Sequence, residues 1–197
     1  MPIELVQTLV GILSALITAV LGVKPVQRML ARWRSRRELT SVLDGMNRTR
    51  EAYGLIHQLC DETTADRVIL FAGHNNGGLP RAHSPFWVSA MYTYTMVRAK
   101  FTILSKYVNL TVDQVYIAML LQSERDGYLL LETATMPDCQ LKQYYLAEHV
   151  TFAMICFVAV REKKFVYLSI AKYAPEPFPE SDVTNIQLYV NQLKGLV

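Results

Sequence analysis

The first two dozen residues constrain this chain more than any other segment. Residues 3–23 form an apolar run of 21 residues with a single charge, Glu4, at its outer edge. A helix of that length spans roughly 30 Å, the thickness of a bilayer's hydrocarbon core. Residues 1–24 are therefore predicted to form one transmembrane helix. A cleavable signal peptide is the competing interpretation, but the run is long for a signal core and no Lys or Arg precedes it.

A basic cluster follows the apolar run directly, with no acidic residue before Glu38. Its six members are Lys24, Arg28, Arg32, Arg34, Arg36 and Arg37. Because positive charge collects on the cytoplasmic side of a span, the cluster predicts a single-pass protein of the inner (cytoplasmic) membrane with its C-terminal domain in the cytoplasm. Nucleic acid is the alternative partner. The neighbouring apolar run and Trp33 favour the lipid bilayer and its anionic headgroups instead.

Two patterns predict that the chain associates with itself. Small residues recur in the apolar run, which would let another helix approach closely. Beyond the basic cluster, residues 25–62 are predicted to be a juxtamembrane segment and connecting helix, because apolar side chains alternate there at spacings of three and four. This seam either pairs with a copy of itself or lies on its own domain. Its members are Leu39, Val42, Met46, Thr49, Tyr53, Ile56 and Cys60.

Residues 63–197 show the pattern of a separate α+β domain. Strands are predicted at residues 67–73, 86–97, 128–133, 150–160 and 165–173, where β-branched and aromatic residues gather. Helices are predicted at residues 115–121, behind a capping box at Thr111, and at residues 136–147, with Pro137 in the first turn. A last helix follows Ser181 as N-cap, with Asp182 in its first turn. This order predicts an antiparallel sheet with helices packed on it.

Composition and motifs exclude several classes of function. The chain is 51% hydrophobic and 19% charged, which is too apolar for intrinsic disorder. Cys60, Cys139 and Cys156 have neither disulfide-framework nor metal-ligand spacing. The sequence contains no catalytic triad, paired-carboxylate motif, Walker loop or dinucleotide fingerprint. We therefore expect neither enzymatic activity, nor a cofactor, nor a bound metal.

Three segments together resemble a GAF-like domain. They are the strand start at residues 65–68 with the loop at residues 74–78, the stretch at residues 144–150, and the loop at residues 177–182. The first is similar to the "ADRV…HNGG" opening of a bacterial and phage-associated GAF-like group. The resemblance covers residues 39–197. Gly73 departs from it by standing where that group has an aromatic residue, and Asn76 is inserted before the glycine pair.

This resemblance implies a GAF/PAS-like sheet, preceded here by the single transmembrane helix, and a sensory or scaffolding role. GAF-like domains bind small molecules in a pocket between sheet and helices, or dimerise and pass on strain. The chain is accordingly interpreted as a membrane-anchored module that senses a small molecule or protein partner as a homodimer. The alternative is a structural or lysis-associated membrane protein of viral (phage) or bacterial origin, which would use the lobe for assembly.

The candidate ligand-binding residues fall into two groups. The first is a polar glycine loop whose backbone N–H groups suit an anion, made of His74, Asn75, Asn76, Gly77 and Gly78. The second is a set of tyrosines able to line a pocket, namely Tyr92, Tyr94 and Tyr128. The competing interpretations are that the loop only forms a turn and that the tyrosines only pack in the core, and the residue types favour both.

Overall fold

The computed structural model describes residues 3–22, 24–75, 86–96, 104–161 and 164–197. The chain divides into two compact units, residues 1–47 and residues 48–197. One helix, α2 (Lys24–Asp61), runs through the boundary between them. Each unit is described by itself below.

The first unit contains α1 (Ile3–Gly22) and the beginning of α2. Its apolar side chains are exposed. The large apolar side chains of α1 that the structure describes are each 46% to 62% exposed. None of the helices, as far as their residues are described, combines the length and the apolar character needed to cross a membrane. The transmembrane helix expected over residues 1–24 therefore stays a prediction.

The predicted connecting helix is confirmed, and its seam divides into two halves. Ile56 and Cys60 are fully buried within the second unit, whereas Val42 and Met46 are 59% and 64% exposed. The C-terminal half of the seam therefore packs on its own domain, which is one of the two interpretations of the sequence. The N-terminal half of the seam is not covered by other described residues of its own unit.

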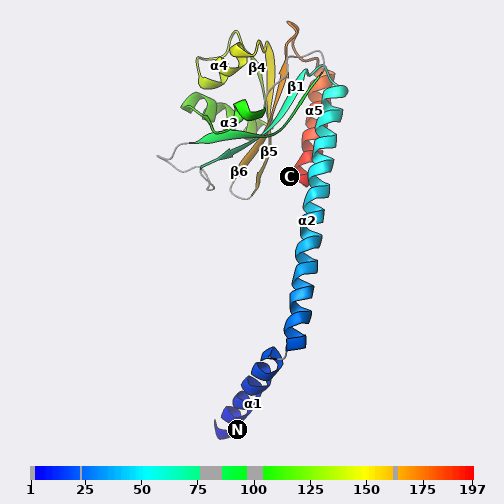
Figure 1. Ribbon diagram of the computed structural model, residues 1–197. Helices are drawn as coiled ribbons and strands as arrows, with labels where there is room; N and C mark the ends of the chain where they lie inside the picture. Colours follow the sequence, from blue (N-terminus) through cyan, green and yellow to red (C-terminus); the bar gives the residue numbers. More distant parts are fainter. Residues whose placement is uncertain (1–2, 23, 76–85, 97–103, 162–163) are drawn as a thin grey trace. The chain divides into compact units, whose positions relative to one another are not determined.

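The second unit is built on a six-stranded antiparallel sheet with the order β3-β2-β1-β6-β5-β4 (Figure 1). The strands predicted at residues 150–160 and 165–173 form the antiparallel β5–β6 pair, and β6 also pairs with β1. The strand bounds are β1 (Arg67–His74), β2 (Trp87–Thr95), β3 (Leu110–Thr111), β4 (Tyr128–Glu132), β5 (Phe152–Arg161) and β6 (Lys164–Lys172).

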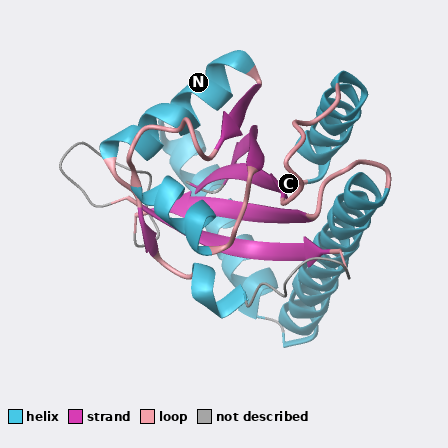
Figure 2. Ribbon diagram, turned by 90° about the horizontal axis from the view of Figure 1, so that it is seen from above, coloured by secondary structure: helices cyan, strands magenta, loops and turns pink. Residues whose placement is uncertain are grey.

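Helices cover both faces of this sheet, which explains why its central strands are almost continuously apolar (Figure 2). Alternate side chains of β1 enter two different clusters: Val68 and Leu70 pack with α2 and α5 (Glu180–Leu196), and Ile69 and Phe71 pack on the opposite face. That opposite face carries the 3-10 turn η1 (Leu104–Tyr107), α3 (Gln114–Asp126) and α4 (Gln140–Ala147). The predicted α+β class is confirmed.

Three helix starts differ from the sequence-based expectations. The cap of α3 is Asp113 rather than Thr111, because the Asp113 Oδ1 accepts the Tyr116 N–H at 2.8 Å. The other carboxylate oxygen of Asp113 accepts the Gln140 N–H at 2.5 Å, so α4 begins after Cys139 and not at residue 136. The cap of α5 is Pro179, without a side-chain hydrogen bond, in place of Ser181.

Two buried carboxylates fasten the loops that flank the central strands. Asp182, in the first turn of α5 as predicted, accepts hydrogen bonds from the Thr64 N–H and hydroxyl, each at 2.7 Å. Asp66 accepts the Tyr173 N–H at 2.8 Å. Both contacts join segments more than 100 residues apart in sequence, and they fix the start of β1, where the candidate site lies.

Candidate functional site

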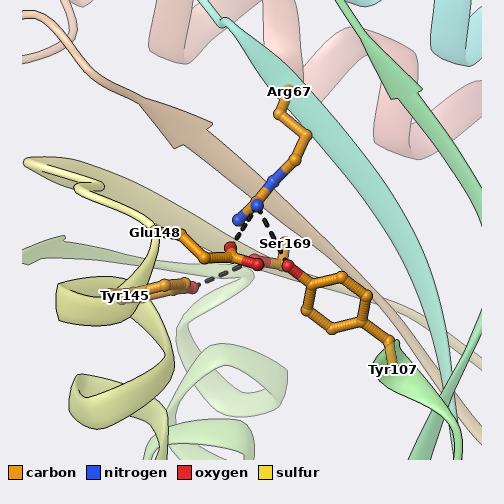
Figure 3. Close-up of polar contacts among 5 residues, drawn as sticks. All are labelled: Arg67, Tyr107, Tyr145, Glu148 and Ser169. Atoms are coloured by element: carbon orange, nitrogen blue, oxygen red, sulfur yellow. Dashed lines mark hydrogen bonds and ion pairs between the residues drawn. The ribbon is translucent and has the colours of Figure 1, made fainter. Parts of the chain in front are cut away.

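A charged residue opens the otherwise apolar strand β1 and defines the centre of the site. Arg67 is only 2% exposed, and its side chain points to the face covered by α3 and α4. A buried guanidinium needs partners, because burying an unpaired charge is costly. Its Nη1 donates to the Tyr107 hydroxyl at 3.2 Å and forms an ion pair with Glu148 (Figure 3).

The partner carboxylate comes from the end of α4. Glu148 is the residue directly after this helix, where its backbone N–H bonds the carbonyls of Tyr144 and Tyr145. Its side chain is 24% exposed, so the ion pair joins the protein interior to the rim of the pocket. The Tyr145 hydroxyl makes a second link from α4 to the sheet, with Ser169 Oγ on β6 at 3.0 Å (Figure 3).

Tyrosine hydroxyls complete the polar lining behind Arg67. Tyr116 on α3 and Tyr167 on β6 are both buried, and their hydroxyl oxygens lie 2.7 Å apart. Burial raises the pKa of Tyr145 to about 12 and also raises the pKa of Tyr116 and of Tyr167 well above the usual value for tyrosine. All three phenols are therefore neutral near pH 7 and act as hydrogen-bond donors and acceptors rather than as bases.

The pocket that these groups line is almost filled by protein. Its cavity volume is about 10 Å³, which is room for roughly one water molecule. Its wall is mostly apolar and aromatic, with Phe71, Tyr107 and Leu110 on one side and Leu141 and Tyr144 on the other. A few convergent polar groups in an apolar concavity are typical of small-molecule sites. Among the described residues, no group of His, Cys, Asp and Glu side chains is arranged to hold a metal ion.

The predicted glycine loop begins at the other end of β1 from this pocket. His74 is half-buried, with its Nε2 3.0 Å from Ser89 Oγ, and Ser89 Oγ in turn accepts the Asn109 N–H at 2.9 Å. Asn75 is half-buried beside it. The remaining loop candidates lie outside the described residues: Asn76, Gly77 and Gly78. His74 and Asn75 therefore lie apart from the Arg67 pocket.

The predicted tyrosines lie on the face of the sheet opposite to Arg67. Tyr92 stacks on Tyr53 with ring centroids 3.7 Å apart, and its hydroxyl contacts His57 Nε2. Burial and the neighbouring tyrosines raise the pKa of Tyr92. Tyr94 stacks on His57 at 3.9 Å, and Tyr128 packs against the cluster formed with α2 and α5. Their ligand-binding role stays a prediction. The contacts seen are ring packing, together with hydrogen bonds from Tyr92 to His57 and from Tyr94 to Asp61.

The predicted membrane-surface residues lie on α2. Arg28, Arg32, Arg34 and Arg37 have exposed side chains, while the side chains of Lys24 and Arg36 lie outside the described part of the chain.

The sequence analysis did not select the residues that meet in the pocket, although two of the segments that carry the family resemblance contain some of them. Arg67 lies in the first segment, and Tyr145 and Glu148 lie in the second. A usable signal was present, because a charged residue at the head of an apolar buried strand needs a buried partner. No local pattern in the sequence identifies Glu148 as that partner.

Comparison with known proteins places the fold. No model of a known protein family matches the chain, and no curated protein sequence matches it. Solved structures do match. A far-red cyanobacteriochrome photoreceptor shares 13% identity over 84% of this chain and 94% of its own, with a TM-score of 0.54. The GAF domain/HD domain protein of Geobacter sulfurreducens shares 12% over 75% of this chain and 90% of its own, with a TM-score of 0.53.

A third match is the PixJ GAF domain of Thermosynechococcus elongatus in its blue-light absorbing form. It shares 12% identity over 75% of this chain and 84% of its own, with a TM-score of 0.50. At such identities the likeness establishes the fold alone. The second unit therefore has a GAF-like fold, with a curled antiparallel sheet between two layers of helices.

Proposed function

We propose that the chain is a GAF-like sensory or regulatory module that binds a small molecule, anchored to a membrane by its N-terminal helix and acting as a dimer without catalysis. The observation that carries the ligand-binding part is the Arg67 pocket. Polar groups from β1, β6, η1 and α4 converge there between the sheet and its helices. Such convergence in an apolar concavity supports recognition of a small molecule.

Ligand binding is tested on the purified full-length chain. Small molecules extracted from it are identified by mass spectrometry, and a thermal-shift screen with nucleotides and metabolites follows. Leu110→Trp narrows the pocket, because Leu110 is a half-buried wall residue. Leu121→Trp, on an exposed position of α3, is the matched control.

We expect Leu110→Trp to abolish the ligand or its thermal shift and Leu121→Trp to retain it. His74→Ala shows which of the two candidate sites binds the ligand. A ligand bound at the His74 loop would be lost in this variant but kept in Leu110→Trp. If the purified protein carries no small molecule and its thermal midpoint responds to no compound in the screen, the sensory role is rejected.

Membrane anchoring is supported by the apolar run, by the six cations behind it, and by the exposure of the α1 side chains. Leu16 lies near the centre of the run, and Leu16→Arg should cost about 3 kcal/mol of insertion. Leu188→Arg, on an exposed position of α5, is the control. Membrane fractionation that is unchanged by Leu16→Arg would reject the anchor.

Dimerisation is supported by the exposed N-terminal half of the α2 seam, because apolar residues at spacings of three and four favour pairing of helices. Val42→Asp places a charge in this seam, and Arg48→Asp, on an exposed position of the same helix, is the control. Sedimentation of the full-length chain should show dissociation for Val42→Asp only. A wild-type chain that sediments as a monomer would reject the dimer.

The alternative function is a structural or lysis-associated membrane protein of viral or bacterial origin whose lobe serves assembly. One observation favours it: the pocket has a cavity volume of only about 10 Å³. Under this alternative the Arg67 cluster is a structural tie between α4 and the sheet. This alternative would be supported if the purified protein carries no small molecule, responds to none in the screen, and forms assemblies larger than a dimer.

A further inference from the structure

The pocket proposed as a ligand site already contains a carboxylate, and this occupant comes from the chain itself. The Glu148 side chain pairs with the Arg67 guanidinium and is 24% exposed, whereas Arg67 is 2% exposed. The positive charge is thus fixed in the interior, and the negative charge is attached at the rim. The small remaining volume is a consequence, since the Glu148 carboxylate fills the space in front of the guanidinium (Figure 3).

Glu148 can leave this position without unfolding α4. It follows the last residue of the helix, and its backbone N–H is bonded to the carbonyls of Tyr144 and Tyr145. The helix has an independent tie to the sheet through the Tyr145 hydroxyl and Ser169. The next residue, His149, is exposed. Release of the carboxylate therefore needs only rotation about its own side-chain bonds, between staggered rotamers.

We propose that Glu148 occupies the place of a ligand, and that the ligand is a small organic acid whose carboxylate displaces that of Glu148 from Arg67. This inference rests on the proposed ligand-binding function. A carboxylate suits the guanidinium because both groups are planar and can form two parallel hydrogen bonds. The Tyr107 hydroxyl, 3.2 Å from Arg67 Nη1, lies beside the same place.

The walls of the pocket indicate the remainder of the ligand. Phe71, Tyr107, Leu110 and Tyr144 present apolar and aromatic surface next to the place that Glu148 would vacate. An aromatic acid fits this chemistry: its carboxylate pairs with Arg67, and its ring packs on the aromatic side chains. A neutral ligand of the same shape would be disfavoured, because it would displace the Glu148 carboxylate from Arg67 and bring no charge in its place.

An internal competitor has a measurable consequence. The apparent affinity for an external acid is lowered by the fraction of molecules in which Glu148 has left the guanidinium. Removing the competing charge should therefore strengthen binding. Glu148→Gln does so while keeping the size of the side chain and an amide oxygen that still accepts from Arg67. Glu124→Gln, on an exposed position of α3, is the matched control.

The probe is benzoate, and benzamide is its uncharged counterpart. Calorimetric titration of the full-length chain should give benzoate an affinity about tenfold or more higher for Glu148→Gln than for wild type or Glu124→Gln. Benzamide should bind none of them. The double variant Arg67→Met with Glu148→Gln should lose benzoate binding while circular dichroism shows that it folds. Benzoate binding that is equal in wild type and Glu148→Gln, or that survives in the double variant, overturns the inference.

The wild-type chain provides a measurement that does not depend on any variant. Benzoate in large excess should raise its thermal midpoint, and the same concentration of benzamide should not. Equal shifts, or no shift, overturn the inference.

Failure of this inference is distinguishable from failure of the proposed function. If the screen finds a neutral ligand that Leu110→Trp abolishes, while benzoate does not bind Glu148→Gln, the pocket is a ligand site but not one for organic acids. If the screen also finds no ligand, both proposals fail.

Discussion

The buried hydroxyl pair behind Arg67 allows a sharp test of how this lobe is stabilised. Tyr116 and Tyr167 are 2% and 0% exposed, and their hydroxyl oxygens lie 2.7 Å apart. Replacing either residue with Phe removes one hydroxyl and leaves the other buried without this partner. An unsatisfied buried polar group costs about 1–3 kcal/mol. Tyr116→Phe and Tyr167→Phe should each lower the free energy of unfolding by that amount.

The double variant should be much less destabilised than the sum of the single variants. It leaves neither hydroxyl of the pair buried, so the main penalty disappears. Two missing oxygens free roughly the volume of one water, about 30 Å³. At about 24 cal/mol per Å³ of cavity, this costs about 0.7 kcal/mol. With single losses of about 1.5 kcal/mol each, the two side chains should show a coupling energy of about 2 kcal/mol.

The measurement is a double-mutant cycle from urea unfolding of the full-length chain, followed by circular dichroism. Tyr128→Phe, a half-buried tyrosine on the opposite face, is the control and should change stability by less than about 0.5 kcal/mol. Additive losses in the double variant, with a coupling energy near zero, would refute the reasoning. Additive losses would mean that each hydroxyl forms a hydrogen bond with water or another group when the other hydroxyl is removed.

Two further predictions concern the same face. Gly73→Ala should lower the thermal midpoint of the full-length chain, because an added Cβ would collide with the Phe86 ring and lie 3.4 Å from the Phe165 carbonyl oxygen; an unchanged midpoint would show that Phe86 moves aside freely. Burial raises the pKa of Tyr145 to about 12 and raises that of Tyr167 well above its usual value, so the neutral form of each phenol favours the folded state. Stability in urea should therefore hold below about pH 10 and fall as the pH rises through about 12, in step with tyrosinate absorbance, and a flat profile would contradict this.

The glycine prediction also explains a departure from the family pattern. Gly73 stands where the resembling group has an aromatic residue, and the Phe86 ring lies directly over the position that its side chain would take. Phe86, the residue just before β2, thus covers this part of β1. The sequence showed the departure, but only the pairing of the two strands shows which residue accounts for it.

The local elements of this protein follow from its sequence. Apolar runs of strand length predicted strands β5 and β6, and the alternating seam predicted the connecting helix. Helix starts were less accurate, because caps depend on which side chain reaches a free N–H group. Asp113 caps α3 and also accepts the first N–H group of α4, a contact across 27 residues that no local pattern contains.

The site was decided by the tertiary structure. The sequence placed Arg67 at the head of a buried strand and Glu148 after a short helix, but residues 81 positions apart meet only because β1 lies in the centre of the sheet with α4 on its face. The faces of the strands were decided in the same way, and Tyr92 and Tyr94 proved to lie opposite to the pocket. Periodicity along a chain determines which side chains share a face. A buried charge needs a partner, and here that partner comes from a distant segment that only the tertiary packing brings close.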